Sequence, residues 1–253
     1  MVAVTHTVLL RAVPHSWFGA LVAALVELAE ECRVVDGRVV LPDGTDVEGT
    51  RLVTGRHLRP GAVYSVDDGE GGACRIALKE WNRRRSLRAR FEVKHPEAFM
   101  TWEAGLRGVD RPLLAEVSGE AQVVDAPKMF SNWAGSVRLR FEDWWAAADS
   151  GTAVRTAPLR IRLRGRPFRA EVRAAPRPAG DDRHWRVQVT VTARGRGLLR
   201  PVAALVLPLT KRRVQHSVAK SLDGLAESWN EDLPPLLELD GADLREEILR
   251  QDS

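Results

Sequence analysis

Four ionisable side chains extend the apolar faces of stretches whose polarity alternates from residue to residue: His6, Glu80, His95 and Asp143. An ionisable group at the end of an apolar row is desolvated, and desolvation shifts its pKa in the direction that favours the neutral form. Such a group suits general acid–base catalysis near neutral pH. These four residues are therefore the candidate catalytic residues, and a histidine beside a carboxylate is the arrangement they would have to form.

Each of the four also has a purely structural interpretation, because inference from perturbed titration alone is probabilistic. His6 fits a hydrogen-bonded core histidine, and His95 precedes Pro96 and could simply end a strand. Glu80 could pair with Arg83 or Arg84. For each residue taken alone, Asp143 included, the structural interpretation is the favoured one. The sequence leaves both interpretations open for every one of them.

Large apolar side chains could line a ligand site near these groups. The chain has eight tryptophans, and aromatic side chains dominate core burial in most proteins, so ordinary packing is the favoured interpretation for most of them. Trp144 and Trp145 would point to opposite faces if they lie in a strand. The candidate ligand-binding residues are Trp81, Phe91, Phe141, Trp145, Trp185, Leu222 and Trp229.

The elements that must position these residues are mostly strands. Between residues 73 and 194 the apolar residues recur with a period of two, as in "LRARFEV", "VRLRFEDWW", "LRIRLR" and "WRVQVTV". A period of two is typical of a sheet with one buried and one solvated face. The polar positions of these stretches are largely arginine, so we expect one antiparallel sheet with an apolar face and an arginine-rich face.

Helices are expected near both ends of the chain. A first strand at 4–12 is followed by a helix that starts at Pro14 and ends near "EEC", and Asp-Gly turns at 34–49 predict hairpins. A second helix is expected at 210–230, with Val214, Val218, Leu222, Leu225 and Trp229 on its apolar face. Its opposite, charged face carries Arg213, His216, Lys220, Asp223 and Glu227. At about 30 Å this helix is long enough to cross a curved sheet. An acidic tail at 231–253 follows.

Composition limits the classes of protein. The chain has 253 residues, 44% of them hydrophobic, so it can bury a sizeable core. Its 38 basic residues are offset by 34 acidic ones, and its two cysteines have no partners at metal-ligand spacing. The apolar stretches at 17–28 and 198–209 are shorter than the roughly 20 residues that span a bilayer. We expect a cytoplasmic protein with no transmembrane segment, no cofactor and no metal.

The two ends of the chain resemble the SRPBCC superfamily, the START-like helix-grip proteins that include polyketide cyclases, aromatases and lipid carriers. Residues 184–229, beginning "HWRVQVTVTARG", look like the closing strand and C-terminal helix of that family, and "THTVLLRAVPHSWFGALVAAL" is similar to its first strand and helix. The resemblance implies an α+β fold in which a curved antiparallel sheet grips the long C-terminal helix around an apolar cavity. The middle of the chain matches only as several antiparallel strands.

The predicted organisation is one helix-grip domain at 1–230, with insertions around 33–72 and 95–135 that account for the extra length over the family. In the family, chemistry comes from a few polar groups that project into the cavity. The resemblance therefore implies a cofactor-free cyclase or aromatase of secondary metabolism, in which a His–carboxylate pair enolises or dehydrates a polyketone. The alternative is a non-catalytic carrier or sensor of a lipid or metabolite, which needs only apolar walls and an anchoring side chain. A homodimer is left open.

A third hypothesis is the binding of nucleic acid or another polyanion on the arginine-rich face. Guanidinium groups on a sheet could follow a phosphate backbone. Interleaved glutamates could instead pair with these arginines, and no nucleic-acid-binding motif is present, so this class is less favoured. The arginines concerned are Arg88, Arg90, Arg138, Arg140, Arg160, Arg162 and Arg164.

Overall fold

The computed structural model describes residues 2–67, 72–150, 156–181, 183–195, 211–239 and 243. The chain divides into two compact units. The first unit consists of Met1–Val13 and Ala126–Leu237, and the second of Pro14–Asp125 and Glu238–Ser253. The candidate residues are therefore divided between the two units.

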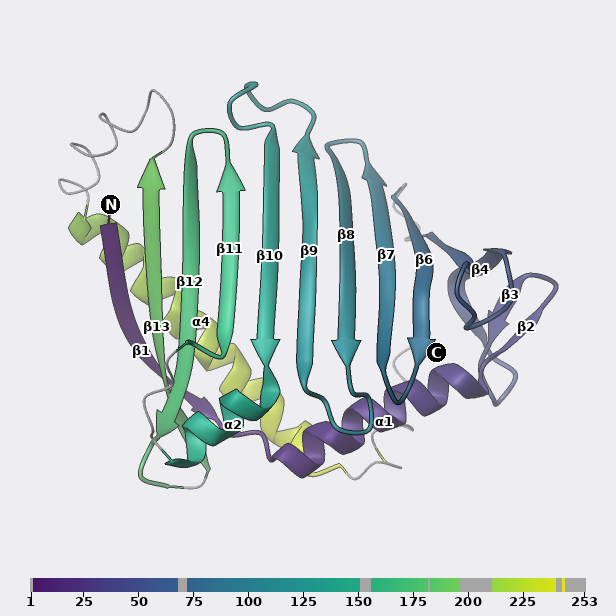
Figure 1. Ribbon diagram of the computed structural model, residues 1–253, viewed down its shortest axis with the longest axis horizontal. Helices are drawn as coiled ribbons and strands as arrows, with labels where there is room; N and C mark the ends of the chain where they lie inside the picture. Colours follow the sequence, from purple (N-terminus) through teal and green to yellow (C-terminus); the bar gives the residue numbers. More distant parts are fainter. Residues whose placement is uncertain are drawn as a thin grey trace. The chain divides into compact units, whose positions relative to one another are not determined.

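The first unit is a five-stranded antiparallel sheet with two helices. Its strands follow the order β1-β13-β12-β11-β10 (Figure 1). The bounds are β1 Val2–Arg11, β10 Asn132–Arg140, β11 Leu159–Gly165, β12 Phe168–Pro178 and β13 His184–Gly195, with helices α2 Phe141–Ser150 and α4 Lys211–Leu237.

The register of this sheet sorts its side chains into an apolar face and an arginine-rich face, because residues that pair across strands point to the same side. One row of the apolar face consists of Val137, Ile161, Val172, Val191 and Val4. The next row consists of Leu139, Leu159, Ala174, Val189 and His6. His6 is thus the polar end of an otherwise apolar row, as its alternation predicts.

Helix α4 packs along β1, the edge strand of this sheet, and is fastened to its main chain. The Asn230 Nδ2 donates to the carbonyl of Leu9 at 2.9 Å, and the N–H of Arg11 donates to Asn230 Oδ1 at 2.6 Å. Trp229 Nε1 donates to the carbonyl of Arg11 at 3.0 Å. An edge strand carries main-chain groups without a neighbouring strand, and these bonds satisfy them. Ala226 and Leu233 form the buried side of the helix.

Helix α2 occupies a stretch that the alternation predicts as strand. The strand prediction for "VRLRFEDWW" is wrong beyond Arg140, because the helix begins at Phe141. Glu142 and Asp143 lie in its first turn, where negative charge stabilises a helix, and the alanines that follow favour helix. Trp144 and Trp145 consequently lie on one helix rather than on opposite sides of a strand.

The second unit is an eight-stranded antiparallel sheet with the helix α1 His15–Glu31. Its strands follow one another in chain order, from β2 to β9. The bounds are β2 Arg33–Val35, β3 Arg38–Val40, β4 Asp46–Thr54, β5 Val63–Asp67, β6 Ala73–Asn82, β7 Ser86–His95, β8 Ala98–Arg107 and β9 Leu114–Val123.

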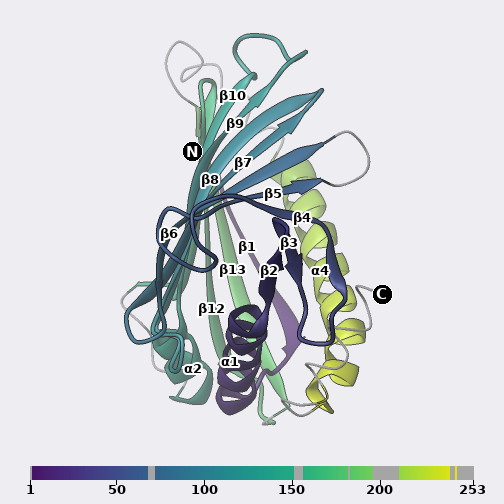
Figure 2. The same cartoon turned by 90° about the vertical axis from the view of Figure 1, so that its right-hand side faces the viewer.

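The end of α1 and strands β2 and β3 lie side by side, as Figure 2 shows, and close the core of the second unit. The buried residues of that core are Leu28, Cys32, Val39, Leu41, Ala62, Tyr64 and Leu78. The end of α1 therefore contributes Leu28 to the hydrophobic core of this unit.

The predicted fold class is wrong. One curved sheet was expected to grip the C-terminal helix, whereas α4 packs along the edge strand of a five-stranded sheet and eight further strands belong to another unit. The bonds from Asn230 and Trp229 to β1 fix the helix at that edge. The single domain predicted at 1–230, with insertions at 33–72 and 95–135, stays a prediction.

Other predicted elements are confirmed. The first strand, the helix after Pro14 and the hairpins at 34–49 are all present. The C-terminal helix is also present, but it runs through Pro234 and Pro235 to Leu237, into the predicted tail. Its predicted apolar face is partly wrong, since Leu225 is 68% exposed. The apolar stretch at 198–209 lies outside the described residues.

Candidate functional site

The predicted catalytic residues fall in both units. His6 on β1 and Asp143 on α2 belong to the first, and Glu80 on β6 and His95 at the end of β7 belong to the second. In the first unit His6 and Asp143 do not pair with each other. Asp143 forms an ion pair with Arg140, three residues before it, at 2.6 Å. The His95 ring accepts a hydrogen bond from the N–H of Glu97 at 3.3 Å. The catalytic roles of all four stay predictions.

His6 does meet a carboxylate, but that of Asp223 on α4. Its Nε2 lies 2.7 Å from Asp223 Oδ1. The imidazole is 28% exposed and the carboxylate 61% exposed, so the pair is accessible from solvent on the side of the helix. On the β1 side the histidine lies between Val4 and Val8, which are both buried. The sequence placed Asp223 on the charged face of the helix and gave no signal that this face meets β1.

The apolar face beside this pair is only partly covered. Val137, Ile161, Val172 and Val191 are half-buried, and Leu163 on the same face is 41% exposed. Helix α4 packs along β1, and α2 packs on β12 and β10. These apolar side chains of β10 to β13 therefore retain contact with solvent.

The predicted ligand-binding aromatic residues separate into two groups. In the first unit, Phe141 stacks on Trp145 with ring centroids 6.0 Å apart, and Trp145 meets Trp185 edge-on at 6.3 Å. In the second unit Phe91 stacks on Trp102 at 5.4 Å.

The other three candidates lie outside these two groups. Trp81 is in the second unit, where its ring donates to Glu30 on α1. Leu222 and Trp229 lie on α4, where Leu222 is half-buried and Trp229 bonds to β1. The ligand-binding role of every predicted residue stays a prediction.

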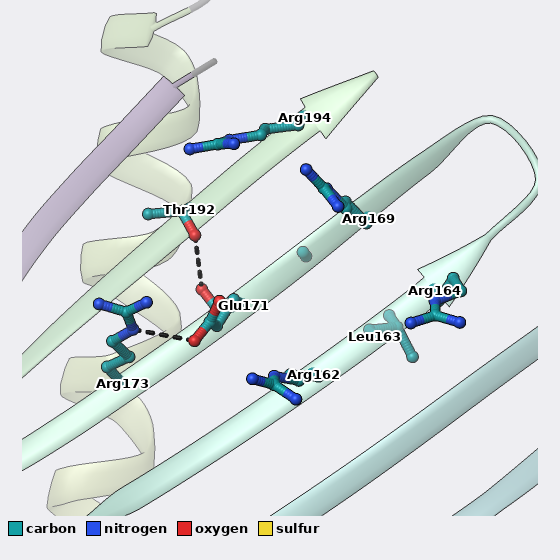
Figure 3. A pocket seen from close by; sticks show the side chains of 9 residues that line it. Arg162, Leu163, Arg164, Arg169, Glu171, Arg173, Thr192 and Arg194 are labelled. Atoms are coloured by element: carbon teal, nitrogen blue, oxygen red, sulfur yellow. Dashed lines mark hydrogen bonds and ion pairs between the residues drawn. The ribbon is translucent and has the colours of Figure 1, made fainter. Parts of the chain in front are cut away.

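The opposite face of the first unit carries a groove of about 550 Å³ lined by five arginines. Figure 3 shows their side chains on β11, β12 and β13 around Glu171. In register, one row of this face contains Arg164, Arg169 and Arg194, and the next contains Arg162, Glu171 and Thr192. A third row contains Arg138, Arg160 and Arg173. The face therefore concentrates positive charge around one carboxylate.

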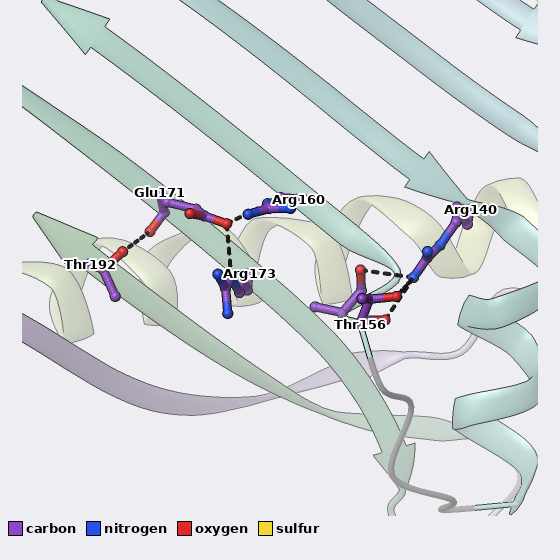
Figure 4. A network of polar contacts seen from close by, with 7 residues as sticks. Arg140, Thr156, Arg160, Glu171, Arg173 and Thr192 are labelled. Carbon is purple, nitrogen blue, oxygen red and sulfur yellow. Dashed lines mark hydrogen bonds and ion pairs between the residues drawn. The ribbon is translucent and has the colours of Figure 1, made fainter.

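Glu171 is held by two of these arginines (Figure 4). Arg160 Nε donates to its Oε1, and Arg173 Nε donates to the same atom at 2.9 Å. The hydrogen bond from Arg160 lowers the pKa of Glu171 to about 2; burial acts in the opposite direction, and Arg173 adds to the lowering. Glu171 is therefore ionised at neutral pH and compensates one of the two positive charges of Arg160 and Arg173.

The structure divides the arginine-rich face that the sequence predicted. Arg88 and Arg90 belong to the second unit, where they pair with Glu103 and Glu92. Arg140 turns to the carbonyls of Thr156 and Ala157 (Figure 4). The interleaved-glutamate interpretation is confirmed for Arg90, which pairs with Glu92, and for Arg160, which pairs with Glu171. The sequence analysis did not single out Arg169, Arg173 and Arg194, although the alternation of "FRAEVR" indicates that the first two share a face.

No protein-family model and no curated protein sequence matches this chain. Among solved structures it is similar to the crystal structure of DynU16, a protein of the dynemicin biosynthetic locus, at 12% identity. The similarity covers 78% of this chain and 87% of that one, with a TM-score of 0.23. A similarity this low carries no argument about fold or function, and the resemblance to the SRPBCC superfamily stays a prediction.

Two further properties follow from the part of the chain that the structure describes. Within it, no helix combines the length and the apolar character that crossing a membrane requires. The described residues also contain no group of three or more His, Cys, Asp or Glu side chains placed to hold a metal ion.

Proposed function

We propose that the first unit binds a bulky hydrophobic small molecule on the apolar face of its sheet, beside the pair formed by His6 and Asp223. The observation that carries this proposal is the position of the pair at the end of a row whose other members, Leu139 to Val189, are apolar. An apolar surface with a few placed polar groups is typical of small-molecule sites. The half-buried side chains Ile161, Val172 and Val191 supply such a surface.

The pair gives this site a chemistry. When Nε2–H of His6 donates to the Asp223 carboxylate, the imidazole is held in one tautomer and Nδ1 carries the lone pair. Nδ1 is then the atom that removes a proton from the ligand, and the carboxylate stabilises the imidazolium that forms. Removal of a proton from the carbon beside a ketone gives an enolate, the step that a cofactor-free cyclase or aromatase needs. His6 would return the proton to a leaving hydroxyl in a dehydration.

The second candidate is a carrier or sensor that binds the same kind of molecule without chemistry. The 61% exposure of Asp223 favours it, because a general base works best where water is excluded. The two candidate functions predict different effects of Asp223→Asn on turnover. A carrier keeps its ligand affinity and has no turnover to lose, whereas an enzyme keeps affinity and loses kcat.

Native mass spectrometry of the purified chain, followed by organic extraction, tests the binding itself. We expect a bound neutral molecule of defined mass. The variant Val172→Thr/Val191→Thr places two hydroxyls in one cross-strand row of the apolar face without changing side-chain size much. It should lose the bound molecule, and the matched variant Val34→Thr/Val47→Thr, at two half-buried valines of the other unit, should keep it. Equal occupancy in both variants would contradict the proposed site.

A further inference from the structure

The arginine-lined groove lies on the face of the first unit that the proposed function does not use. We propose that it is a separate binding site for a small molecule bearing a phosphate or diphosphate group, with Arg164, Arg169 and Arg194 as its principal contacts. Arg162 and Thr192, in the neighbouring row, line the same groove.

The three principal arginines form one cross-strand row. Arg169 pairs in register with Arg164 on one side and with Arg194 on the other. Neighbouring strands lie about 4.8 Å apart, so the Cα atoms of the three arginines lie within about 10 Å of one another. Like charges directly opposite each other destabilise a sheet. A bound anion would remove the repulsion between Arg164 and Arg169, and a guanidinium can bind a phosphate through two parallel N–H donors.

The carboxylate of the groove, Glu171, pairs with arginines of another cross-strand row. Glu171 binds Arg160 and Arg173 through the same Oε1 atom. The row of Arg164, Arg169 and Arg194 contains no acidic residue, and within the described part of the chain Arg164 and Arg169 form no ion pair. The end of the groove at Arg164 and Arg169 is therefore the part whose positive charge no carboxylate of the described residues offsets.

The dimensions favour a small ligand over a nucleic acid. A volume of 550 Å³ falls in the range of small-molecule sites. Beyond Arg173 along the same face come Ala175 and Gln188, which pair in register, so an uncharged row separates the groove from the next arginines, Arg177 and Arg186. A phosphate backbone would need the positive surface to continue.

The chain offers a matched control for the test. Arg177 and Arg186 also pair directly across β12 and β13 on the same face, eight residues along β12 from Arg169, at about 26 Å. Neither lines the groove. Arg169→Gln/Arg194→Gln and Arg177→Gln/Arg186→Gln remove the same charge from the same two strands, one pair inside the groove and one outside it.

Isothermal titration calorimetry with inorganic pyrophosphate at low ionic strength measures the site in the full chain. We expect one saturable site in the wild-type protein, a Kd at least ~10-fold weaker in Arg169→Gln/Arg194→Gln, and a change below about 2-fold in the control pair. Arg169→Lys/Arg194→Lys keeps the charge but loses the bidentate geometry, and its Kd should lie in between. Circular dichroism melting checks that all variants fold, and a groove variant that does not fold leaves the lysine variant to decide.

Three results would overturn the proposal. Equal weakening by the two glutamine pairs would mean that pyrophosphate senses the surface charge only. The absence of saturable binding would mean that the groove has no anion site. A single-stranded DNA oligonucleotide whose affinity rises with its length, and falls in the groove variant alone, would assign the groove to nucleic acid instead.

Discussion

The imidazole of His6 and the carboxylate of Asp223 meet at 2.7 Å across 217 residues of sequence, joining the first strand to the C-terminal helix. Both elements belong to the first unit, and the contact lies at the edge of its apolar face. The pair is largely accessible, so its contribution to stability should be small compared with its contribution to any chemistry at that face.

Replacing His6 by valine should therefore leave the fold nearly unchanged. A valine side chain at this position would complete the row that runs from Leu139 to Val189, and the loss of an exposed ion pair costs about 0–1 kcal/mol. Urea denaturation should show a change in the free energy of unfolding of less than about 1 kcal/mol. A loss several times larger would mean that the pair is a structural element and not a site.

Asn230 should matter more to stability than the ion pair. Its side chain exchanges two hydrogen bonds with the main chain of Leu9 and Arg11 at the sheet edge. Asn230→Ala leaves both groups without that partner, and we expect the free energy of unfolding to fall by about 1–3 kcal/mol. Ser228→Ala on the same helix removes only a bond to Asp232 and should cost less than about 0.5 kcal/mol. Equal effects of the two substitutions in urea denaturation would contradict the edge role of Asn230.

Glu171 should make the stability of the first unit depend on pH. Its pKa in the folded protein is about 2, below the ordinary 4.5, because Arg160 and Arg173 stabilise the ionised form. Such a lowered pKa contributes stability above pH 4.5, and the contribution is lost as the pH falls from 4.5 toward 2. The difference in free energy of unfolding between wild type and Glu171→Gln should be largest at neutral pH and shrink across that interval. A difference that does not change with pH would contradict the assigned cause.

The same substitution should strengthen anion binding in the groove. Removing the carboxylate releases Arg160 and Arg173 from their shared partner and takes away a negative charge beside the ligand. Pyrophosphate titration should give a lower Kd for Glu171→Gln than for the wild type, by about 3- to 10-fold. A weaker Kd would indicate that Glu171 positions the arginines instead of competing with the anion.

In the second unit, Tyr64 links a loop to the core. Its hydroxyl donates to His57 Nδ1 and accepts from the N–H of Leu58, both at 2.9 Å, while His57 Nε2 donates to the Ala29 carbonyl on α1. Tyr64→Phe leaves the ring in the core and removes both bonds, so we expect a loss of about 1–2 kcal/mol in the free energy of unfolding. Thermal denaturation followed by circular dichroism measures it, and an unchanged Tm would show that water replaces the hydroxyl.

Local sequence patterns predicted the elements better than their arrangement. The period of two identified the faces of β7, β11, β12 and β13, since side chains alternate whatever the partner strand is. It could not show which strands share a core, because the pairing of distant strands leaves no periodic trace. The alternation also continued past Arg140 into α2, where the charge of Glu142 and Asp143 in the first helical turn favours the helix.

The candidate site shows the same limit. His6 was singled out because it interrupts an apolar row, which is a property of one strand. Its partner was not, because Asp223 looks like any solvated residue on a charged helix face until the position of α4 against β1 is known. The anchoring of α4 depends on Asn230 and Trp229, and neither a lone asparagine nor a tryptophan indicates which strand it will contact.

Methyl-resolved NMR of the protein with a neutral aromatic probe such as 2-naphthol tests the central claim most directly. Neutrality excludes simple attraction to the arginine face. We predict saturable shifts of the methyl groups of Ile161, Val172 and Val191, with the methyl groups of Leu28, Val39 and Leu78 unchanged. Shifts confined to the second unit, or no saturable shift at all, would contradict a hydrophobic ligand site on the apolar face of the first unit.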